Sequence, residues 1–259
     1  MDYQTITLAV RDTVAVLTMN RPDVMNALNT QMRAEITHAV KAAQGEGARA
    51  LVLTGAGRAF CSGQDLGDGA TAARMDLERV LRDEYVPMLT AILDCPLPVI
   101  AAVNGAAAGA GANLALVADV ILASEEAFFQ QAFTRIGLIP DAGGTWFLPR
   151  HVGYQRAMGA SLFADRITAR QAVEWGMVYE AVPAADFDAH WRARAAQLAA
   201  GPTETYRLLK EAMRASFENR IDEQLALEGR LQGRLGQSRD FKEGIVAFLE
   251  KRPPQFEGR

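Results

Sequence analysis

Three short apolar runs, two of them closed by a glycine, constrain the fold of this chain more than any other feature. They cover residues 50–54, 99–103 and 120–123 and are rich in Val, Ile, Leu and Ala. Continuous apolar runs of this length are typical of strands buried on both faces, as in parallel sheets covered by helices. Between the first two runs, an apolar stripe at helical spacing predicts a helix over residues 77–93. The order strand, glycine loop, helix, strand predicts an α/β fold.

Two further strands and a helical C-terminal region complete the predicted organisation. Strands are expected at residues 5–10 and 14–19, followed by a helix over 30–43 that the Thr30 hydroxyl caps. We expect an α/β core over residues 1–195 and a helical region over 196–259 that packs on the core and on a neighbouring subunit. The helices expected beyond residue 154 cover residues 157–162, 169–175, 185–198, 204–216, 221–235 and 241–249.

Composition excludes several classes of protein. With 259 residues and 49% hydrophobic residues, the chain can bury a sizeable core as one large domain or two small ones. No stretch approaches the ~20 uncharged apolar residues of a membrane span, and no secretory signal is recognisable. Cys61 and Cys95 are too few for a disulfide framework, which fits the cytoplasm. A net charge of −4 argues against a nucleic-acid-binding surface.

Two glycine loops are candidates for binding an oxygen through backbone N–H groups. Gly63-Gln64-Asp65 comes after the first buried strand, and Gly109-Ala110-Gly111 comes after the second. The N–H groups at a helix start lack partners, and glycines let a ligand approach the backbone. If the loops face one cavity, one N–H from each could stabilise an enolate oxygen. For a single such loop, tight turns and close helix packing are the favoured explanation.

Other chemistries fit these residues poorly. The second loop has Leu114 where the dinucleotide fingerprint needs its last glycine or alanine, and no phosphate loop with Gly-Lys-Ser or Gly-Lys-Thr is present. For Cys61 and Ser62 a packed or turn role is favoured over a nucleophilic one, because the three histidines form no recognisable triad pattern.

Asp141 is the candidate catalytic residue. It is a lone carboxylate in the glycine turn over residues 136–144, so a reaction that needs one acid is expected. Apolar neighbours such as Phe133, Ile136 and Leu138 would raise its pKa above the ordinary value of about 3.9 if they line the same pocket. The alternative is that Asp141 only caps the following helix.

Taken together, the motifs identify a family. Asn20-Arg21-Pro22, Asn26-Ala27-Leu28, both glycine loops, residues 140–145 and the ending 248–252 resemble the crotonase (enoyl-CoA hydratase/isomerase) superfamily along essentially the whole chain. The resemblance implies a spiral of strand-strand-helix units and a coenzyme A thioester substrate. It also implies a homo-oligomer, a trimer or a dimer of trimers, assembled through C-terminal helices. No cofactor is expected, since coenzyme A is part of the substrate.

The resemblance also assigns roles by position. The two oxyanion N–H groups fall on Gln64 and Ala110, and the single acid of the isomerases falls on Asp141. The two glutamates that hold water in hydratases match Asn113 and Phe133, neither of which transfers protons near neutral pH. For Asp65 a structural role in its loop is favoured. The expected substrate-binding residues are Ser62, Gly63, Asp65, Leu66, Gly111, Asn113, Phe133 and Pro140.

The predicted function is therefore that of an acyl-CoA isomerase. Residues 138–146 and 174–177 are most similar to the isomerases of phenylacetate degradation, which convert ring-1,2-epoxyphenylacetyl-CoA to oxepin-CoA. Similar proteins shift a Δ3 double bond to Δ2, a reaction for which one base suffices. Two alternatives stay open: a general Δ3,Δ2-enoyl-CoA isomerase of fatty-acid oxidation, and a non-catalytic acyl-CoA-binding protein of the same fold.

Overall fold

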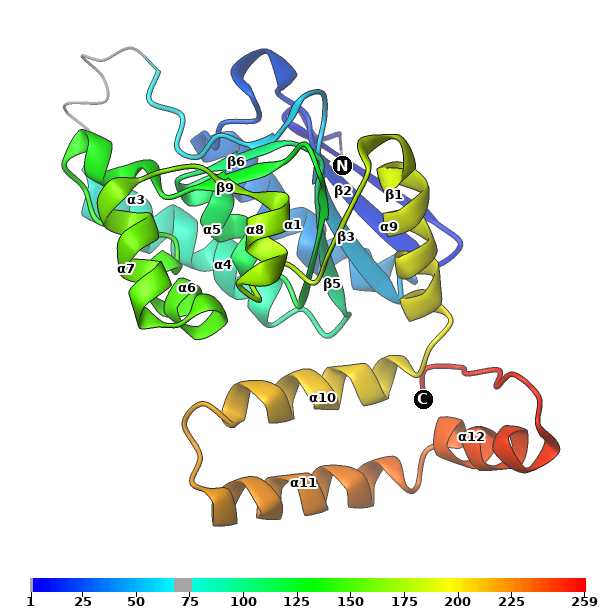
Figure 1. Ribbon diagram of the computed structural model, residues 1–259. Coiled ribbons are helices and arrows are strands. Elements are labelled where there is room, and N and C mark those ends of the chain that lie inside the picture. The colour runs from blue at the N-terminus through cyan, green and yellow to red at the C-terminus, as the bar shows by residue number, and fades with distance from the viewer. Residues whose placement is uncertain (1, 68–75) are drawn as a thin grey trace.

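The computed structural model describes residues 2–67 and 76–259, in which strands and helices alternate before a helical C-terminal region (Figure 1). The strands are β1 (Ile6–Arg11), β2 (Val14–Met19), β3 (Ala50–Gly55), β4 (Ala59–Cys61), β5 (Val99–Val103), β6 (Ala106–Ala108), β7 (Val120–Ser124), β8 (Phe128–Gln130), β9 (Ile167–Thr168) and β10 (Glu180–Val182). The helices are α1 (Thr30–Gly45), α3 (Leu77–Val80), α4 (Val86–Leu93), α5 (Ala110–Leu116), α6 (Gly144–Val152), α7 (Tyr154–Phe163), α8 (Ala169–Glu174), α9 (Ala184–Ala199), α10 (Thr203–Ala215), α11 (Ile221–Leu235) and α12 (Arg239–Glu250). Short turns of helix are η1 (Pro22–Val24), η2 (Leu81–Tyr85) and η3 (Ala132–Ile136).

A six-stranded sheet forms the centre of the core. Its strand order is β1-β2-β3-β5-β7-β10, with β1 antiparallel to β2 and the other neighbours parallel. The predicted strands at β3, β5 and β7 are confirmed, and both faces are covered. Leu51 and Leu53 face α1 and α4, whereas Val52 faces α9. Burial on both faces explains why the sequence of β3 is a continuous apolar run.

A second sheet, which the sequence did not predict, lies beside the first. It has the order β4-β6-β8-β9, and β4, β6 and β8 run parallel. β4 and β6 start a few residues after β3 and β5 end, and α5 follows β6 directly. The chain therefore repeats a strand-strand-helix unit, as the family resemblance implies. Each parallel strand of the second sheet ends in a loop on the same edge.

The helix predicted over residues 77–93 contains a π turn. α3 passes into η2, where the Val86 N–H bonds to the Leu81 carbonyl, five residues back, and α4 then runs to Leu93. The cause lies in Pro87, which has no N–H to donate to the carbonyl four residues earlier. The helix end before Pro96 is as predicted. Tyr85, the last residue of η2, is 2% exposed.

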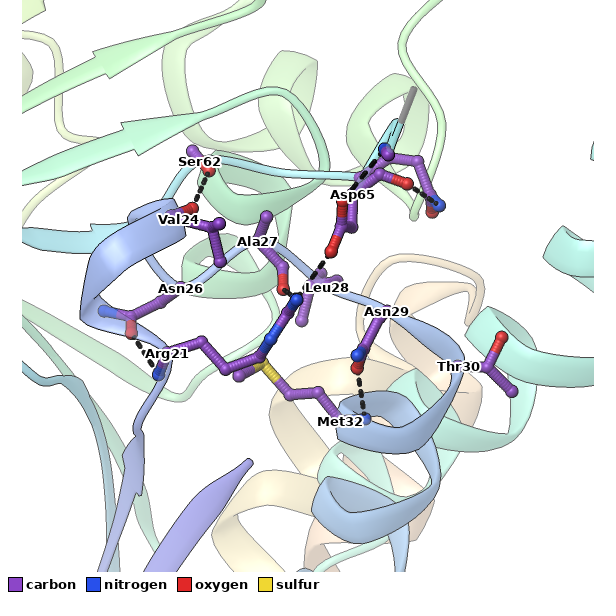
Figure 2. A network of polar contacts seen from close by, with 12 residues as sticks. Arg21, Val24, Asn26, Ala27, Leu28, Asn29, Thr30, Met32, Ser62 and Asp65 are labelled. Atoms are coloured by element: carbon purple, nitrogen blue, oxygen red, sulfur yellow. Dashed lines mark hydrogen bonds and ion pairs between the residues drawn. The ribbon is translucent and has the colours of Figure 1, made fainter. Parts of the chain in front are cut away.

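Three details differ from the sequence-based expectations. Asn29, not Thr30, caps α1, because its Oδ1 accepts a hydrogen bond from the Met32 N–H at 2.8 Å (Figure 2). Strands β9 and β10 interrupt the segment predicted to be helical. The bounds of α6, the helix after Asp141, were not predicted, since Pro149 inside it conceals the helical pattern.

The C-terminal helices lie apart from the main body (Figure 1). The predicted division after residue 195 falls inside α9, whose Phe187 and Trp191 pack on the sheet. α10 is fastened to the core by the Lys210 ammonium, which donates to the carbonyls of Cys95 and Leu97, both at 2.7 Å. Among the residues that the structure describes, no helix combines the length and apolar character needed to cross a membrane.

Candidate active site

The second sheet brings the two glycine loops together. β4 leads into the loop of Gly63 and Gln64, and its neighbour β6 leads into Gly109 and Ala110. A Cβ on Gly63 would lie 2.8 Å from the Ala108 carbonyl oxygen and 3.3 Å from the Ala110 nitrogen, and Gly63 has a φ of +97°. Only glycine combines this backbone conformation with so close an approach. The two backbones are thus nearly in contact where the sequence predicted a shared oxyanion site.

Leu28 fixes the direction of the Gln64 peptide. The Leu28 N–H donates to the Gly63 carbonyl at 2.8 Å, and the Asp65 N–H donates to the Leu28 carbonyl at 3.1 Å. This is a parallel bridge between Leu28 and Gln64, and in such a bridge the N–H of the central residue points away from its partner. Among the described residues, no partner takes up the Gln64 N–H. It is available to a ligand.

Ala110 supplies the second candidate donor. It is the first residue of α5, whose first-turn N–H groups have no partner within the helix. Gly109, at the N-cap, has φ 53° and ψ −130° and donates its own N–H to the Gln130 carbonyl at 2.8 Å. This backbone turn, which favours glycine, starts the helix at Ala110 beside Gly63. The two N–H groups therefore come from adjacent loops, as an oxyanion hole requires.

Asp141 has a buried carboxylate oxygen without a hydrogen-bond partner among the described residues. Its side chain does not cap α6, which has Gly143 at its N-cap and no side-chain cap bond, so the capping alternative is wrong. Burial raises the pKa of Asp141 from 3.8 to about 6. A buried carboxyl without neutralising partners is costly in a structural role and suits a proton-transferring one.

The backbone of Asp141 is held by Asn113, one of the two positions predicted to match the hydratase glutamates. The Asn113 Nδ2 donates to the Asp141 carbonyl at 2.8 Å, and its Oδ1 accepts from the Gln131 Nε2 at 2.8 Å. The Gly144 N–H donates to the same carbonyl at 2.8 Å, and a Cβ on Gly144 would overlap the Asn113 amide. Asn113 is 0% exposed. Its amide therefore holds the backbone of the Asp141 loop.

Asp141 and both glycine loops line one cavity of about 330 Å³. A second cavity, of about 360 Å³, adjoins it and shares Leu77, Leu81, Tyr85, Leu138 and Asp141. Its remaining lining is almost wholly apolar, from the α3 to α4 segment and from residues 138–143. Asp141 therefore stands between a compartment with two backbone donors and an apolar compartment. The first cavity is lined by Ser62, Gly63, Gln64, Leu66, Leu77, Val80, Leu81, Tyr85, Gly109, Ala110, Ala132, Phe133, Arg135, Ile136, Leu138 and Asp141.

Most of the site residues expected from the sequence lie on these walls. Phe133, Ile136 and Leu138 share the cavity with Asp141, and Pro140 lines the adjoining one. Three expected substrate-binding residues, Asp65, Gly111 and Asn113, line neither cavity. Gly111 packs against β4 instead, where a Cβ would overlap the Cys61 carbonyl.

Asp65 has a structural partner, as the sequence favoured. Its Oδ2 accepts from the Arg21 Nη1 at 2.7 Å, and the same nitrogen donates to the Ala27 carbonyl at 2.7 Å (Figure 2). Its Oδ1 accepts from the Gly67 N–H at 3.0 Å, and the Arg21 guanidinium helps to lower the pKa of Asp65 against the effect of burial. This contact ties the Gln64 loop to the segment before α1.

Cys61 and Ser62 show no sign of nucleophilic activation. Cys61 is fully buried, and burial raises the pKa of its thiol to about 12. The Ser62 hydroxyl donates to the Val24 carbonyl at 3.3 Å (Figure 2). Both residues thus have the packed or turn roles that the sequence favoured.

No site role was predicted for Tyr85 or Arg135, which also line the cavity with Asp141. Tyr85 belongs to the apolar stripe of the predicted helix, and that stripe was the only signal available for it. A stripe of this kind is ordinarily a core face, so the sequence alone could not assign Tyr85 to a site.

Comparison with known protein families gives a consistent picture. The family model described as enoyl-CoA hydratase/isomerase matches residues 9–259. The chain is 63% identical over its full length, and over the full length of the relative, to a Rhodobacter capsulatus protein named "Probable enoyl-CoA hydratase". It is 44% identical to the 1,2-epoxyphenylacetyl-CoA isomerase of Escherichia coli, with 95% of each chain covered.

Further relatives extend this range of activities. The trans-2-decenoyl-[acyl-carrier-protein] isomerase of Streptococcus mutans is 35% identical, with 100% of each chain covered. Among solved structures, the enoyl-CoA hydratase of Bacillus anthracis superposes with a TM-score of 0.91 at 32% identity, covering 99% of this chain and 100% of that one. Relatives named as hydratases and relatives named as isomerases thus both match this sequence over nearly its full length.

Proposed function

The chain belongs to the enoyl-CoA hydratase/isomerase family, and within that family we propose that it is an acyl-CoA isomerase with Asp141 as its proton-transferring carboxylate. The observation that carries the proposal is the unpartnered, buried Asp141 oxygen in a cavity shared with both glycine loops. The E. coli and S. mutans relatives are isomerases by name and support it.

The proposed chemistry moves one proton within the substrate. The Asp141 carboxylate takes a proton from the carbon next to the thioester carbonyl, and the N–H groups of Gln64 and Ala110 hold the resulting enolate oxygen. With a 3-enoyl substrate, the same carboxylic acid returns the proton two carbons away, so the double bond shifts from Δ3 to Δ2 while no atom is gained or lost. The reaction as proposed needs neither a metal nor a redox cofactor, because the thioester itself stabilises the carbanion.

We propose an acyl group that is either a ring epoxide of phenylacetate or an unbranched 3-enoyl chain. The apolar cavity next to Asp141 suits both. The 44% identity to the E. coli enzyme favours the ring epoxide, which would place the protein in phenylacetate degradation. Product analysis with both thioesters ranks the two substrates by relative kcat/KM.

Hydration is the competing activity, because the R. capsulatus relative bears the name of a hydratase. The structure offers Asp141 and no second acid at the positions of Asn113 and Phe133, both of which are buried. Crotonyl-CoA hydration at a rate above that of isomerisation would contradict the proposal.

The decisive experiment is exchange of the α-proton of an acyl-CoA in deuterated water. Wild-type protein should exchange it, Asp141→Asn should lose the exchange, and Asp188→Asn should keep it. Asp188 is the matched control because its side chain is 71% exposed on α9 and pairs with Arg192. Exchange that survives in Asp141→Asn would refute the assignment of the base, and exchange that is absent from wild type would favour a non-catalytic binder.

We also propose that the chain self-associates through its C-terminal helices, as a trimer or a dimer of trimers in the cytoplasm. Ile221 and Leu225 on α11 and Phe248 and Leu249 on α12 are 58–83% exposed. Exposed apolar surface of this extent marks an interaction face. Light scattering after gel filtration gives the number of chains, and a monomer at micromolar concentration would contradict this part of the proposal.

A further inference from the structure

The side chain of Gln64 is anchored on three sides, although only its backbone N–H has a proposed role in catalysis. Its Oε1 accepts hydrogen bonds from the Arg33 Nη1 and from the Tyr85 hydroxyl, both at 2.8 Å. Its Nε2 donates to the Asp65 carbonyl at 2.9 Å. An amide with both lone-pair positions and one N–H engaged has little rotational freedom. The residue is therefore fixed at its side chain as well as at its backbone.

Arg33 connects this anchor to the backbone that orients the Gln64 peptide. The Nη1 that bonds Gln64 also donates to the Leu28 carbonyl at 2.6 Å. Leu28 is the partner of Gln64 in the parallel bridge, so one guanidinium nitrogen touches both members of that bridge. The remaining guanidinium nitrogens bind Glu84, with Nε at 3.1 Å and Nη2 at 2.6 Å.

Burial makes this arrangement costly to form without a function. Arg33 is 2% exposed and Glu84 has 12% of its side chain exposed. Desolvating such a pair offsets much of its attraction, so a buried ion pair is weak support for stability alone. Both Glu84 and Tyr85 belong to the π turn η2, an irregularity that is frequent at functional sites.

We infer that Arg33 and Tyr85 are positioning residues, which act through the Gln64 side chain to aim the Gln64 N–H at the enolate oxygen. The inference rests on the proposed function, because it assumes that this N–H is an oxyanion donor. A donor aimed at developing charge is effective only if its position is set before the reaction. Displacement by a fraction of an ångström weakens it, and the anchored side chain prevents this displacement.

Tyr85 suits this role across the working pH range. Burial raises the pKa of its phenol, so Tyr85 stays neutral and keeps its proton to donate. Its ring also lies under the Arg33 guanidinium, with 4.7 Å between the ring centroid and Cζ. The side-chain amide oxygen of Gln64 thus accepts hydrogen bonds from two different donors, the charged Arg33 and the neutral Tyr85.

The primary test uses Tyr85→Phe and Gln64→Leu. Both variants keep the Gln64 backbone N–H. Tyr85→Phe removes one hydrogen-bond donor to the Gln64 side chain, and Gln64→Leu removes all the hydrogen bonds of that side chain. We expect kcat for α-proton exchange to fall by about 10-fold in Tyr85→Phe and by about 100-fold in Gln64→Leu, with KM nearly unchanged; the second value is at the lower end of the range found for loss of an oxyanion donor. Tyr154→Phe, at a side chain 68% exposed, is the matched control and should match wild type.

A spectroscopic readout separates positioning from mere folding. Hexanoyl-CoA with carbon-13 at the thioester carbonyl is bound to each variant, and the infrared carbonyl band is recorded. Wild type should shift the band to lower wavenumber, and both variants should shift it less at equal melting temperature. An equal shift in all three proteins, or unchanged kcat in Gln64→Leu, would overturn the inference.

This design keeps the inference apart from the proposed function. A shifted carbonyl band without proton exchange in wild type would refute the isomerase and leave the positioning role standing. Adding Tyr85→Phe to Gln64→Leu should cause no further loss, because both act through the same amide, whereas additive losses would contradict the inference. Arg33→Met removes both of the Arg33 hydrogen bonds to Glu84 and leaves it, among the described residues, only the Arg79 Nη1 at 3.3 Å, a loss that threatens folding. Arg33→Lys is therefore used, with kcat expected between those of wild type and Gln64→Leu.

Discussion

The Nδ2 of Asn113 donates a hydrogen bond to the backbone carbonyl of Asp141, at 2.8 Å, across 28 positions of sequence. The position that the resemblance assigns to a water-holding glutamate of hydratases therefore holds the loop of Asp141. Because a Cβ on Gly144 would overlap the Asn113 amide, the space around this amide has no room for a longer side chain at position 113.

Asn113→Glu is thus expected to lose isomerase activity without gaining hydratase activity. The added methylene must displace the Asp141 loop, and proton exchange should fall at least about 10-fold. Crotonyl-CoA hydration, followed by loss of the enoyl absorbance, should stay at the background rate. Asn219→Glu, in the loop between α10 and α11, is the control. Fast hydration by Asn113→Glu would show that the space is sufficient after all.

The rate of proton exchange should depend on pH through Asp141. Burial raises the pKa of this carboxyl to about 6, and the reaction needs its ionised form. The kcat/KM is therefore expected to rise with pH through about 6 and to level off near 7. Measurement from about pH 4.5 to 8 in buffers of constant ionic strength checks this. A profile that is flat over this range would contradict the raised pKa or the role of the carboxylate.

The same pKa has a consequence for stability. Since the folded-state pKa lies above the unfolded value, the stabilising contribution of neutral Asp141 is full below about pH 4 and is lost as pH rises through about 6. Asp141→Asn removes this dependence. Its free energy of unfolding relative to wild type should increase by about 1 to 3 kcal/mol between pH 4 and pH 7. Denaturant titrations at several pH values measure it, and a constant difference would be the contrary result.

Glycine substitutions should separate the site from the rest of the fold. Gly63→Ala introduces a Cβ 2.8 Å from the Ala108 carbonyl at a positive φ, so we expect about 2 kcal/mol of destabilisation and near-complete loss of exchange. Gly229→Ala, inside α11 with no atom within 4 Å, is the matched control. It should leave exchange unchanged and raise stability by up to about 1 kcal/mol. Thermal melting and exchange rates on both variants test the contrast.

The sequence predicted those parts of the fold that depend on local pattern. β3, β5 and β7 are continuous apolar runs because helices cover both faces of their sheet, and burial of this kind is visible in the residues themselves. β4, β6 and β8 were missed because each has three residues, and β6 consists of alanine only. Their existence depends on pairing between distant segments, which no local pattern reports.

The candidate site is also divided into residues that a local sequence pattern predicts and residues that it does not. Asp141 and the two glycine loops were predicted because a lone carboxylate and repeated glycines are unusual enough to read in one sequence. The contacts that support these groups were not predicted, since Arg33 is 31 positions from Gln64 and 51 positions from Glu84 in the sequence. Asn113 was expected to bind substrate, whereas its buried amide bonds to the Asp141 backbone. A side chain that acts through a neighbour has no signature of its own.

The π turn at residues 81–85 leaves the helix segments on either side of it out of phase. A π turn holds one residue more than a regular helical turn, and each residue of a helix turns the chain by about 100° around the helix axis. Leu77 and Leu81, which border both cavities, owe their orientation relative to α4 to that single extra position. Deleting one residue here would rotate Leu77 and Leu81 away from the two cavities while leaving Asp141 in place. Gain or loss of one codon is thus a short evolutionary route to a different acyl preference.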